Sequence, residues 1–218
     1  MKPLYVLVEG QTEEEFFKEN LMPYFADREI FEVRPIKIST KVGFKGGFVK
    51  YDHLKRDTIN LLKQRNNSII STFVDYFRIP TSLPNYNDCL KIYNIDNRIE
   101  CLETAIREDI GSDRFFPYIQ KYEFEALLFS SNIGFENYYE SKVAKETDKI
   151  IQQYPNPEEI NDKPITSPSN RLLNIVPEYK KVLVGNIIAL DIGIETILAK
   201  CPRFRNWVGT LIDLVQEQ

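Results

Sequence analysis

The first forty residues show a strand, helix and strand pattern. A continuous apolar run covers residues 4–8, which suits a strand buried on both faces of a sheet. Apolar residues then recur at helical spacing over 16–25, and residues 31–39 alternate as a second strand. Thr12 and Glu15 match a capping box, so we expect Thr12 to cap this helix. The pattern predicts a β-α-β unit at the start of the chain.

The pattern continues as alternating strands and helices and then becomes helical. The expected segments are a helix over 51–65, a strand over 68–74, an unstructured connection over about 79–88, a helix from 95 to 106, a strand over 115–120, a helix start at 122–129, and helices beyond 130 with a proline-rich interruption at 155–168. This order predicts an α/β fold with a mainly parallel sheet flanked by helices. We expect the α/β core to cover 1–130 and a helical C-terminal extension, 131–218, to pack on it.

The scarcity of histidine and cysteine excludes several kinds of site. His53 is the single histidine, so a histidine-rich zinc site is excluded. The three cysteines (Cys89, Cys101 and Cys201) are far apart and form no C-x-x-C pair, which argues against a disulfide framework and a zinc knuckle. No run has the length of a signal-peptide core or of a membrane span. We therefore expect a cytoplasmic protein with no membrane contact.

The net charge of −4 conceals an uneven distribution of charged side chains. Residues 28–65 carry 10 basic and 4 acidic side chains, a net of +6, whereas 1–27 and 66–170 are net acidic. This arrangement suits a protein that holds a phosphate with one part and a metal ion with another. A solvated lysine-rich loop explains the basic segment equally well.

Carboxylates follow the expected strands at their C-terminal ends. Glu9 closes the first strand, Asp75 closes the third, and Glu123 and Glu125 follow the fourth, while Glu13 lies in the first turn after Glu9. In open parallel sheets, ligands gather beyond these strand ends. Carboxylates without histidine or cysteine form a hard oxygen site suited to Mg²⁺ or Mn²⁺, which serves mostly phosphoryl chemistry.

All of these acids except Glu9 also have a ready structural explanation, whereas Glu9, directly after a buried strand, faces the sheet edge. Glu13 would complement the positive end of a helix, and Asp75 would start an Asx turn. Glu123 and Glu125 would lie about 200° apart on a helix, so one of them is expected at the surface.

Two further segments are candidate phosphate and nucleic-acid contacts. Lys45-Gly46-Gly47 would present backbone N–H groups beside a lysine, although it lacks the spacing of a Walker loop. Arg171, at an expected helix start, would bind an anion. A flexible turn and a surface arginine are the alternatives.

Several short segments stand in a specific order over nearly the whole chain. They are Val-Glu-Gly-Gln-Thr-Glu at 8–13, Lys-Gly-Gly at 45–47, Phe-Val-Asp-Tyr-Phe at 73–77, Pro-Tyr-Ile-Gln at 117–120, Glu-Phe-Glu-Ala-Leu-Leu-Phe at 123–129, Ser-Pro-Ser-Asn-Arg at 167–171, and Cys-Pro-Arg-Phe at 201–204 with Trp207. Their combination resembles the bacterial domain-of-unknown-function family 4276, whose fold is considered Toprim-like. Toprim domains occur in topoisomerases, primases and nucleases of the overcoming-lysogenization-defect type.

The resemblance implies roles for three acids. Toprim domains share a glutamate after strand one and an Asp-x-Asp after a later strand, which hold one or two Mg²⁺ ions for phosphodiester cleavage or transfer. Glu9 would take the glutamate role as acid, base or metal ligand, Glu13 would be an additional ligand, and Asp75 would be the first aspartate.

The chain departs from the resembled pattern at two positions. Phe77 stands where the second aspartate is expected, and Glu123 or Glu125 would have to substitute for it. Tyr122 stands where the family commonly has histidine, so catalysis would use carboxylates, metal and water, or this member would be less active.

We therefore expect a phosphodiesterase of the nuclease type that uses Mg²⁺ or Mn²⁺ on DNA or RNA, with the basic 28–65 segment along the nucleic-acid backbone. A role in defence against phage or mobile DNA follows from Toprim-like relatives alone. The alternative is a non-catalytic Toprim-like subunit that binds nucleic acid or a partner, such as an ATPase encoded by a neighbouring gene. A small-molecule phosphatase is a third reading, and a homodimer is left open.

Overall fold

The centre of the molecule is a parallel β-sheet. The computed structural model describes residues 1–41, 44–45, 48, 50–160 and 164–217. β1 (Leu4–Val8) lies between β2 (Val33–Lys37) and β5 (Ile69–Asp75), and the short strands β6 (Phe115–Phe116) and β7 (Ile119–Gln120) pair with the other side of β5. Every residue of β1 and β5 is buried, as in a sheet covered on both faces. The predicted α/β class with a mainly parallel sheet is confirmed.

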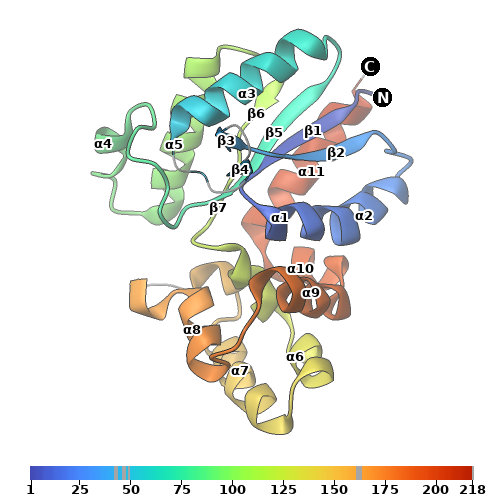
Figure 1. Cartoon of the computed structure of the whole chain (residues 1–218), viewed down its shortest axis with the longest axis vertical. Helices are drawn as coiled ribbons and strands as arrows, with labels where there is room; N and C mark the ends of the chain where they lie inside the picture. The colour runs from blue at the N-terminus through green and yellow to red at the C-terminus, as the bar shows by residue number, and fades with distance from the viewer. Residues whose placement is uncertain (42–43, 46–47, 49, 161–163, 218) are drawn as a thin grey trace.

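Helices cover both faces of the sheet (Figure 1). One face packs against α3 (Tyr51–Gln64) and α5 (Ile95–Ile110), and the other against α1 (Gln11–Phe16), α2 (Met22–Ala26) and the C-terminal α11 (Pro202–Gln216). Alternate residues of β1 and β5 supply the two cores because successive strand side chains point to opposite faces. A π-helical turn, Phe17–Leu21, joins α1 to α2.

A helical layer lies beyond the C-terminal ends of the strands (Figure 1). The chain enters it through a buried 3₁₀ helix, η2 (Phe124–Ser130). Its helices are α6 (Ile133–Tyr138), α7 (Ser141–Gln153), α8 (Pro168–Ile175), α9 (Asn186–Ile192) and α10 (Ile194–Lys200), with 3₁₀ turns η3 (Pro157–Glu159) and η4 (Pro164–Thr166) and a π-helical turn η5 (Lys181–Gly185).

The C-terminal helix leaves this layer and returns to the sheet. In α11, Trp207 donates its indole N–H to Ser71 Oγ of β5 at 2.9 Å, and its ring stacks on Tyr118 with 4.4 Å between centroids. The last helix is therefore part of the packing of the sheet. The domain division at 130/131 stays a prediction.

Three local expectations differ from the structure. Gly10, not Thr12, caps α1, and the Glu13 carboxylate accepts its N–H at 2.9 Å, because the helix begins as soon as the chain leaves the sheet edge. The expected strand over 115–120 is divided into β6 and β7 around Pro117, which has no N–H for a ladder. The expected unstructured connection ends in α4 (Tyr86–Cys89).

Helix α4 changes the interpretation of the cysteines. Cys89 in α4 and Cys101 in α5 form a disulfide, with 5.6 Å between their Cα atoms, and Cys201 is a buried free thiol. The expectation of no disulfide was wrong because the connection after β5 folds back and packs α4 on α5. The cysteine count therefore gives no support to a cytoplasmic location, which stays a prediction.

Among the described residues, no single helix is long and apolar enough to cross a membrane. Residues 181–192 and 194–200 pass that test of length and composition only as a pair, which is bent by 84°.

Candidate functional site

Glu9 and Asp75 lie side by side at the C-terminal edge of the sheet. Glu9 directly follows β1, and Asp75 is the last residue of the adjacent parallel strand β5. The Asp75 backbone N–H donates to Glu9 Oε2 at 3.3 Å, and the Phe48 N–H donates to the same carboxylate. Asp75 Oδ1 in turn accepts the Phe124 N–H at 2.9 Å. The register of two neighbouring strands thus brings these acids together.

Glu13 joins them from the first turn of α1. Its side chain is buried, and Oε2 caps the helix through Gly10. The other oxygen, Oε1, lies 3.5 Å from Lys181 Nζ. Glu13 therefore serves as a helix cap and as a member of the acidic cluster at once.

Glu123 and Glu125 are both buried, so the expectation that one would lie at the surface was wrong. The expectation assumed a helix, but Glu123 is extended and Glu125 lies in η2. Glu123 accepts the Ser169 N–H and hydroxyl, each at 2.9 Å, at the start of α8. Glu125 Oε2 lies 3.2 Å from Lys181 Nζ. The two acids thus face different partners.

The chain turns at Tyr122, directly before these two acids. This residue has φ +65°, in the left-handed region that non-glycine residues rarely adopt. Its carbonyl accepts the Phe77 N–H at 2.8 Å, which ties the end of β7 to the segment after β5. The two positions that depart from the resembled pattern are therefore bonded to each other and direct the chain into η2.

Lys181 is the member of this cluster that sequence reasoning missed. Its ammonium lies 3.5 Å from Glu13, 3.5 Å from Asp75 and 3.2 Å from Glu125. It opens η5, more than 100 positions after Asp75, and no motif surrounds it. Its proximity to the acids arises only from the packing of the helical layer against the strand ends.

The cluster is poorer in positive than in negative charge. The acidic cluster consists of four carboxylates (Glu9, Glu13, Asp75 and Glu125) beside one ammonium, which contacts all of them except Glu9. Burial raises the pKa of Glu9 with help from Glu13, raises that of Asp75 well above its usual range, and raises that of Glu125 to about 7. Burial alone would lower the pKa of Lys181, but Asp75, Glu125 and Glu13 outweigh it and raise that pKa. The site therefore favours uptake of protons or of another cation.

The donors suit a hard cation, although they are not arranged around one. Carboxylate oxygens are the ligands that Mg²⁺ and Mn²⁺ prefer. In the part of the chain that the structure describes, however, no group of three or more Asp, Glu, His or Cys side chains is placed to hold a metal ion. The acids stand at least 3.2 Å from the Lys181 ammonium, whereas Mg²⁺ needs oxygens at about 2.0–2.1 Å. Metal binding would require the carboxylates to draw closer.

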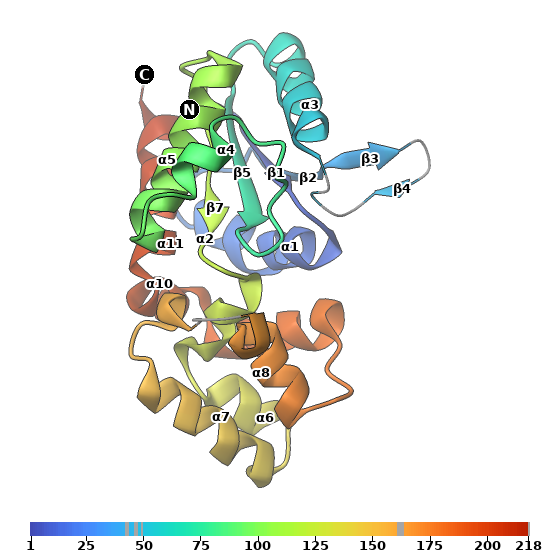
Figure 2. The same ribbon diagram turned by 90° about the vertical axis from the view of Figure 1, so that its left-hand side faces the viewer.

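The proposed phosphate contacts lie in two places. Lys45 belongs to β4 (Phe44–Lys45), which pairs with β3 (Ser39–Lys41) in a hairpin that projects from the sheet (Figure 2). Gly46 and Gly47 lie outside the described residues.

Arg171 lies in α8, within the helical layer. It donates to the Thr166 carbonyl at 2.8 Å and to the Tyr154 hydroxyl at 3.0 Å. Its anion-binding role, like the roles of the other predicted site residues, stays a prediction.

A family model described as "Domain of unknown function (DUF4276)" matches residues 8–212. The chain belongs to this family. Among curated proteins, the comparison finds no match for this DUF4276 member.

Solved structures with a similar fold come from OLD proteins. The C-terminal region of the Burkholderia pseudomallei OLD protein superposes with a TM-score of 0.53 at 15% identity, over 97% of this chain and 98% of that one. The C-terminal region of the Xanthomonas campestris pv. campestris OLD protein gives a TM-score of 0.49 at 14% identity, over 99% and 96%. The first of these likenesses confirms the predicted Toprim-like fold for this DUF4276 chain.

Proposed function

We propose that this DUF4276 protein hydrolyses phosphodiester bonds in nucleic acid with the help of Mg²⁺ or Mn²⁺. The observation that carries the proposal is the set of buried carboxylates around Lys181 at the C-terminal edge of a parallel sheet. The fold shared with OLD C-terminal regions supports it, since Toprim-like relatives include nucleases. The resemblance of Glu9, Glu13 and Asp75 to the Toprim acidic residues gives the same assignment.

Glu9, Glu13, Asp75 and Glu125 would hold the metal, whose chemistry is to neutralise phosphate charge and to activate water. Glu125 is the acid best placed to exchange a proton near neutral pH, because burial raises its pKa to about 7. Lys181 is partly exposed, and its ammonium would bind a phosphate oxygen as the acids turn toward the metal. Glu123, held by Ser169, would keep η2 in position.

The basic 28–65 segment would guide the nucleic acid to these acids. It contains the β3–β4 hairpin and α3, and Phe48, just beyond the hairpin, donates its N–H to Glu9. A phosphate backbone following the hairpin would therefore end at the carboxylates. The basic segment would attract the phosphates of a nucleic acid, and the acidic cluster would hold the metal ion that one of those phosphates then meets.

The test is cleavage of end-labelled DNA and RNA in Mg²⁺ or Mn²⁺ by the wild type, Glu9→Gln and Asp75→Asn. We expect each substitution to lower the rate by about 10²-fold or more. Glu19→Gln, an exposed acid soon after α1, is the matched control and should retain activity. Equal cleavage by all four proteins would assign the activity to a contaminant and refute the proposal.

Two observations favour a second function, a non-catalytic subunit that binds nucleic acid or a partner such as an ATPase. Lys181 already neutralises part of the cluster, and Phe77 replaces an expected aspartate. A rise in melting temperature with Mn²⁺ that disappears in Asp75→Asn would support the metal enzyme. No response to Mn²⁺, together with salt-sensitive DNA binding, would support the subunit.

A further inference from the structure

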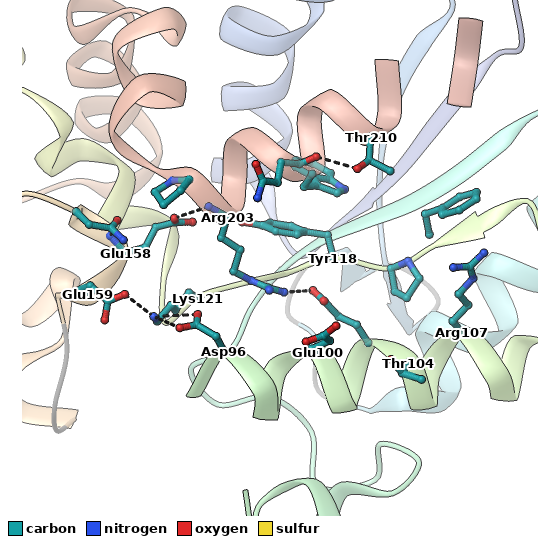
Figure 3. A pocket seen from close by; sticks show the side chains of 17 residues that line it. Asp96, Glu100, Thr104, Arg107, Tyr118, Lys121, Glu158, Glu159, Arg203 and Thr210 are labelled. Carbon is teal, nitrogen blue, oxygen red and sulfur yellow. Dashed lines mark hydrogen bonds and ion pairs between the residues drawn. The ribbon is translucent and has the colours of Figure 1, made fainter. Parts of the chain in front are cut away.

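A groove lies at the sheet edge formed by β6 and β7, between α5 and the start of α11 (Figure 3). Its volume is about 700 Å³, within the usual range for ligand sites. Its walls carry charged side chains of α5, η3 and α11, and its floor is formed by the aromatic residues Phe116, Tyr118 and Trp207. None of the residues that line it belongs to the acidic cluster around Lys181. It is therefore a separate candidate site.

Backbone groups of Phe116, Tyr118 and Ile119 at this sheet edge already have hydrogen-bond partners within the protein. The Phe116 carbonyl accepts the Ser71 hydroxyl, and the Tyr118 N–H and carbonyl both bond to Thr72 Oγ1, at 2.8 and 2.7 Å. The Ile119 N–H donates to Glu103 at 2.7 Å. A visiting strand would find few free backbone groups, so strand addition is disfavoured. Side chains must recognise the occupant.

One end of the groove is strongly acidic. Lys121 is buried, with 2% of its side chain exposed, and it bonds Asp96 at 2.9 Å and Glu159 at 2.7 Å. Those two acids remain half exposed, and Glu100 is exposed one turn further along α5. Glu100 forms no ion pair within the described residues. Two carboxylates thus share the Lys121 ammonium while Glu100 has no cation of its own, and all three acids reach the solvent side of the groove.

The middle of the groove holds an ion pair over an aromatic ring, and a buried carboxylate that caps α11. Arg203 pairs with Glu103 and lies over the Tyr118 ring at 5.4 Å. Glu158 is buried and accepts the backbone N–H groups of Arg203 and Phe204 at 2.8 and 3.0 Å, which caps α11.

Arg107 lies over Phe116, at 4.6 Å, at the other end of the groove. In total, the lining contains five acidic and three basic side chains. The groove is therefore net negative, and the excess lies at the Asp96–Glu100–Glu159 end.

We propose that this groove binds a basic segment of a partner protein. A lysine or arginine of that segment would place its charged head among Asp96, Glu100 and Glu159. The excess of carboxylates disfavours a phosphate-bearing ligand here. The open, elongated lining with charges at its ends suits a peptide better than a compact metabolite.

The test measures fluorescence anisotropy of a labelled hexapeptide, Lys-Arg-Leu-Leu-Arg-Lys, and of its counterpart with glutamate at the four basic positions. Wild type should bind the basic peptide and not the acidic one. Glu100→Lys should weaken binding about fivefold or more at low salt. Glu108→Lys, an exposed acid of the same helix outside the groove, should change it less than twofold. Nuclease activity, if present, should be the same in both variants.

Several results would overturn this proposal. They are no binding of the basic peptide by the wild type, equal binding of both peptides, or equal weakening by Glu100→Lys and Glu108→Lys. Competition by single-stranded DNA that Glu100→Lys strengthens would assign the groove to nucleic acid instead. A dimer that Glu100→Lys dissociates in sedimentation would assign it to a second copy of this chain.

Discussion

Two lysines, Lys181 and Lys121, each lie among several carboxylates, but the burial of acid and base is reversed between them. At Lys181 the base is about one-third exposed (37%), and the acids it contacts are at most 9% exposed. At Lys121 the base is 2% exposed, and the acids are 50% and 53% exposed. At the first site the cation can leave and be replaced. At the second it stays, and the acids are free to bind another cation.

Lys181→Met should produce the largest effect. Its removal takes away the ammonium that would bind a phosphate oxygen, so we expect the cleavage rate to fall by about 10²–10³-fold. Lys121→Met should cleave at the wild-type rate, measured as initial velocity on labelled DNA and RNA in Mn²⁺. Equal losses in the two variants would break the comparison between the sites.

The second largest effect should be a dependence of the free energy of unfolding on pH, which arises at the Lys181 site from Glu125. The pKa of Glu125 rises from 4.5 in the unfolded chain to about 7 on folding, so the folded state binds more protons between these values. Stability should therefore fall as pH rises from about 4.5 to 7, by roughly 3 kcal/mol at most from this group. Urea unfolding at pH 5, 6, 7 and 8 measures the fall.

Glu125→Gln is the variant that tests this origin. In this variant the free energy of unfolding should decrease less as the pH rises, whereas in Glu19→Gln it should decrease as much as in the wild type. Mn²⁺ at pH 8 should restore part of the lost stability, since it replaces the protons. Identical pH slopes for the wild type and Glu125→Gln would show that another group is responsible.

Reduction of the Cys89–Cys101 disulfide should lower stability on the groove side of the molecule and leave the acidic cluster unaffected. Cys101 lies in α5, which forms one wall of the groove, and no member of the acidic cluster lies in α4 or α5. Reduction should lower the free energy of unfolding by about 2–3 kcal/mol, because the closed loop is short. The Cys89→Ser/Cys101→Ser double variant should not respond to reductant. Loss of cleavage on reduction would contradict the separation of the two sites.

Lys121→Met should have the smallest effect on stability. The acids that it leaves behind are half exposed and can be solvated, so we expect a loss below about 1 kcal/mol in urea unfolding at pH 7. A loss of about 3 kcal/mol or more would indicate that Lys121 compensates buried charge, as Lys181 does.

The sequence predicts the parts of the site that local pattern determines. The apolar runs before Glu9 and Asp75 predict two parallel strands of one sheet, whose ends place both acids at the same edge; that the two strands are neighbours is shown by the structure. Glu13 follows from the helix that begins directly after β1. These features need only the strand and helix periods and the rule that parallel strands end at the same edge.

The remaining features depend on packing between distant segments. Lys181 reaches the acids only because η5 lies against the strand ends, and nothing near it in the sequence marks this position. The pairing of Cys89 with Cys101 depends on the fold of the connection after β5. Burial of both Glu123 and Glu125 depends on the left-handed residue Tyr122 and a 3₁₀ helix, which periodicity does not reveal.

A short chain of hydrogen bonds at the start of η2 couples the position of the helical layer to the position of Asp75. Ser169 of α8 holds Glu123, and the next residue, Phe124, holds Asp75 through its N–H. A displacement of α8 would therefore pull on Asp75 across a single peptide link. A Ser169→Ala change would slacken that link, and a weaker Mn²⁺-induced rise in melting temperature would report it. The position of the helical layer therefore helps to determine how the Asp75 carboxylate is placed in the cluster.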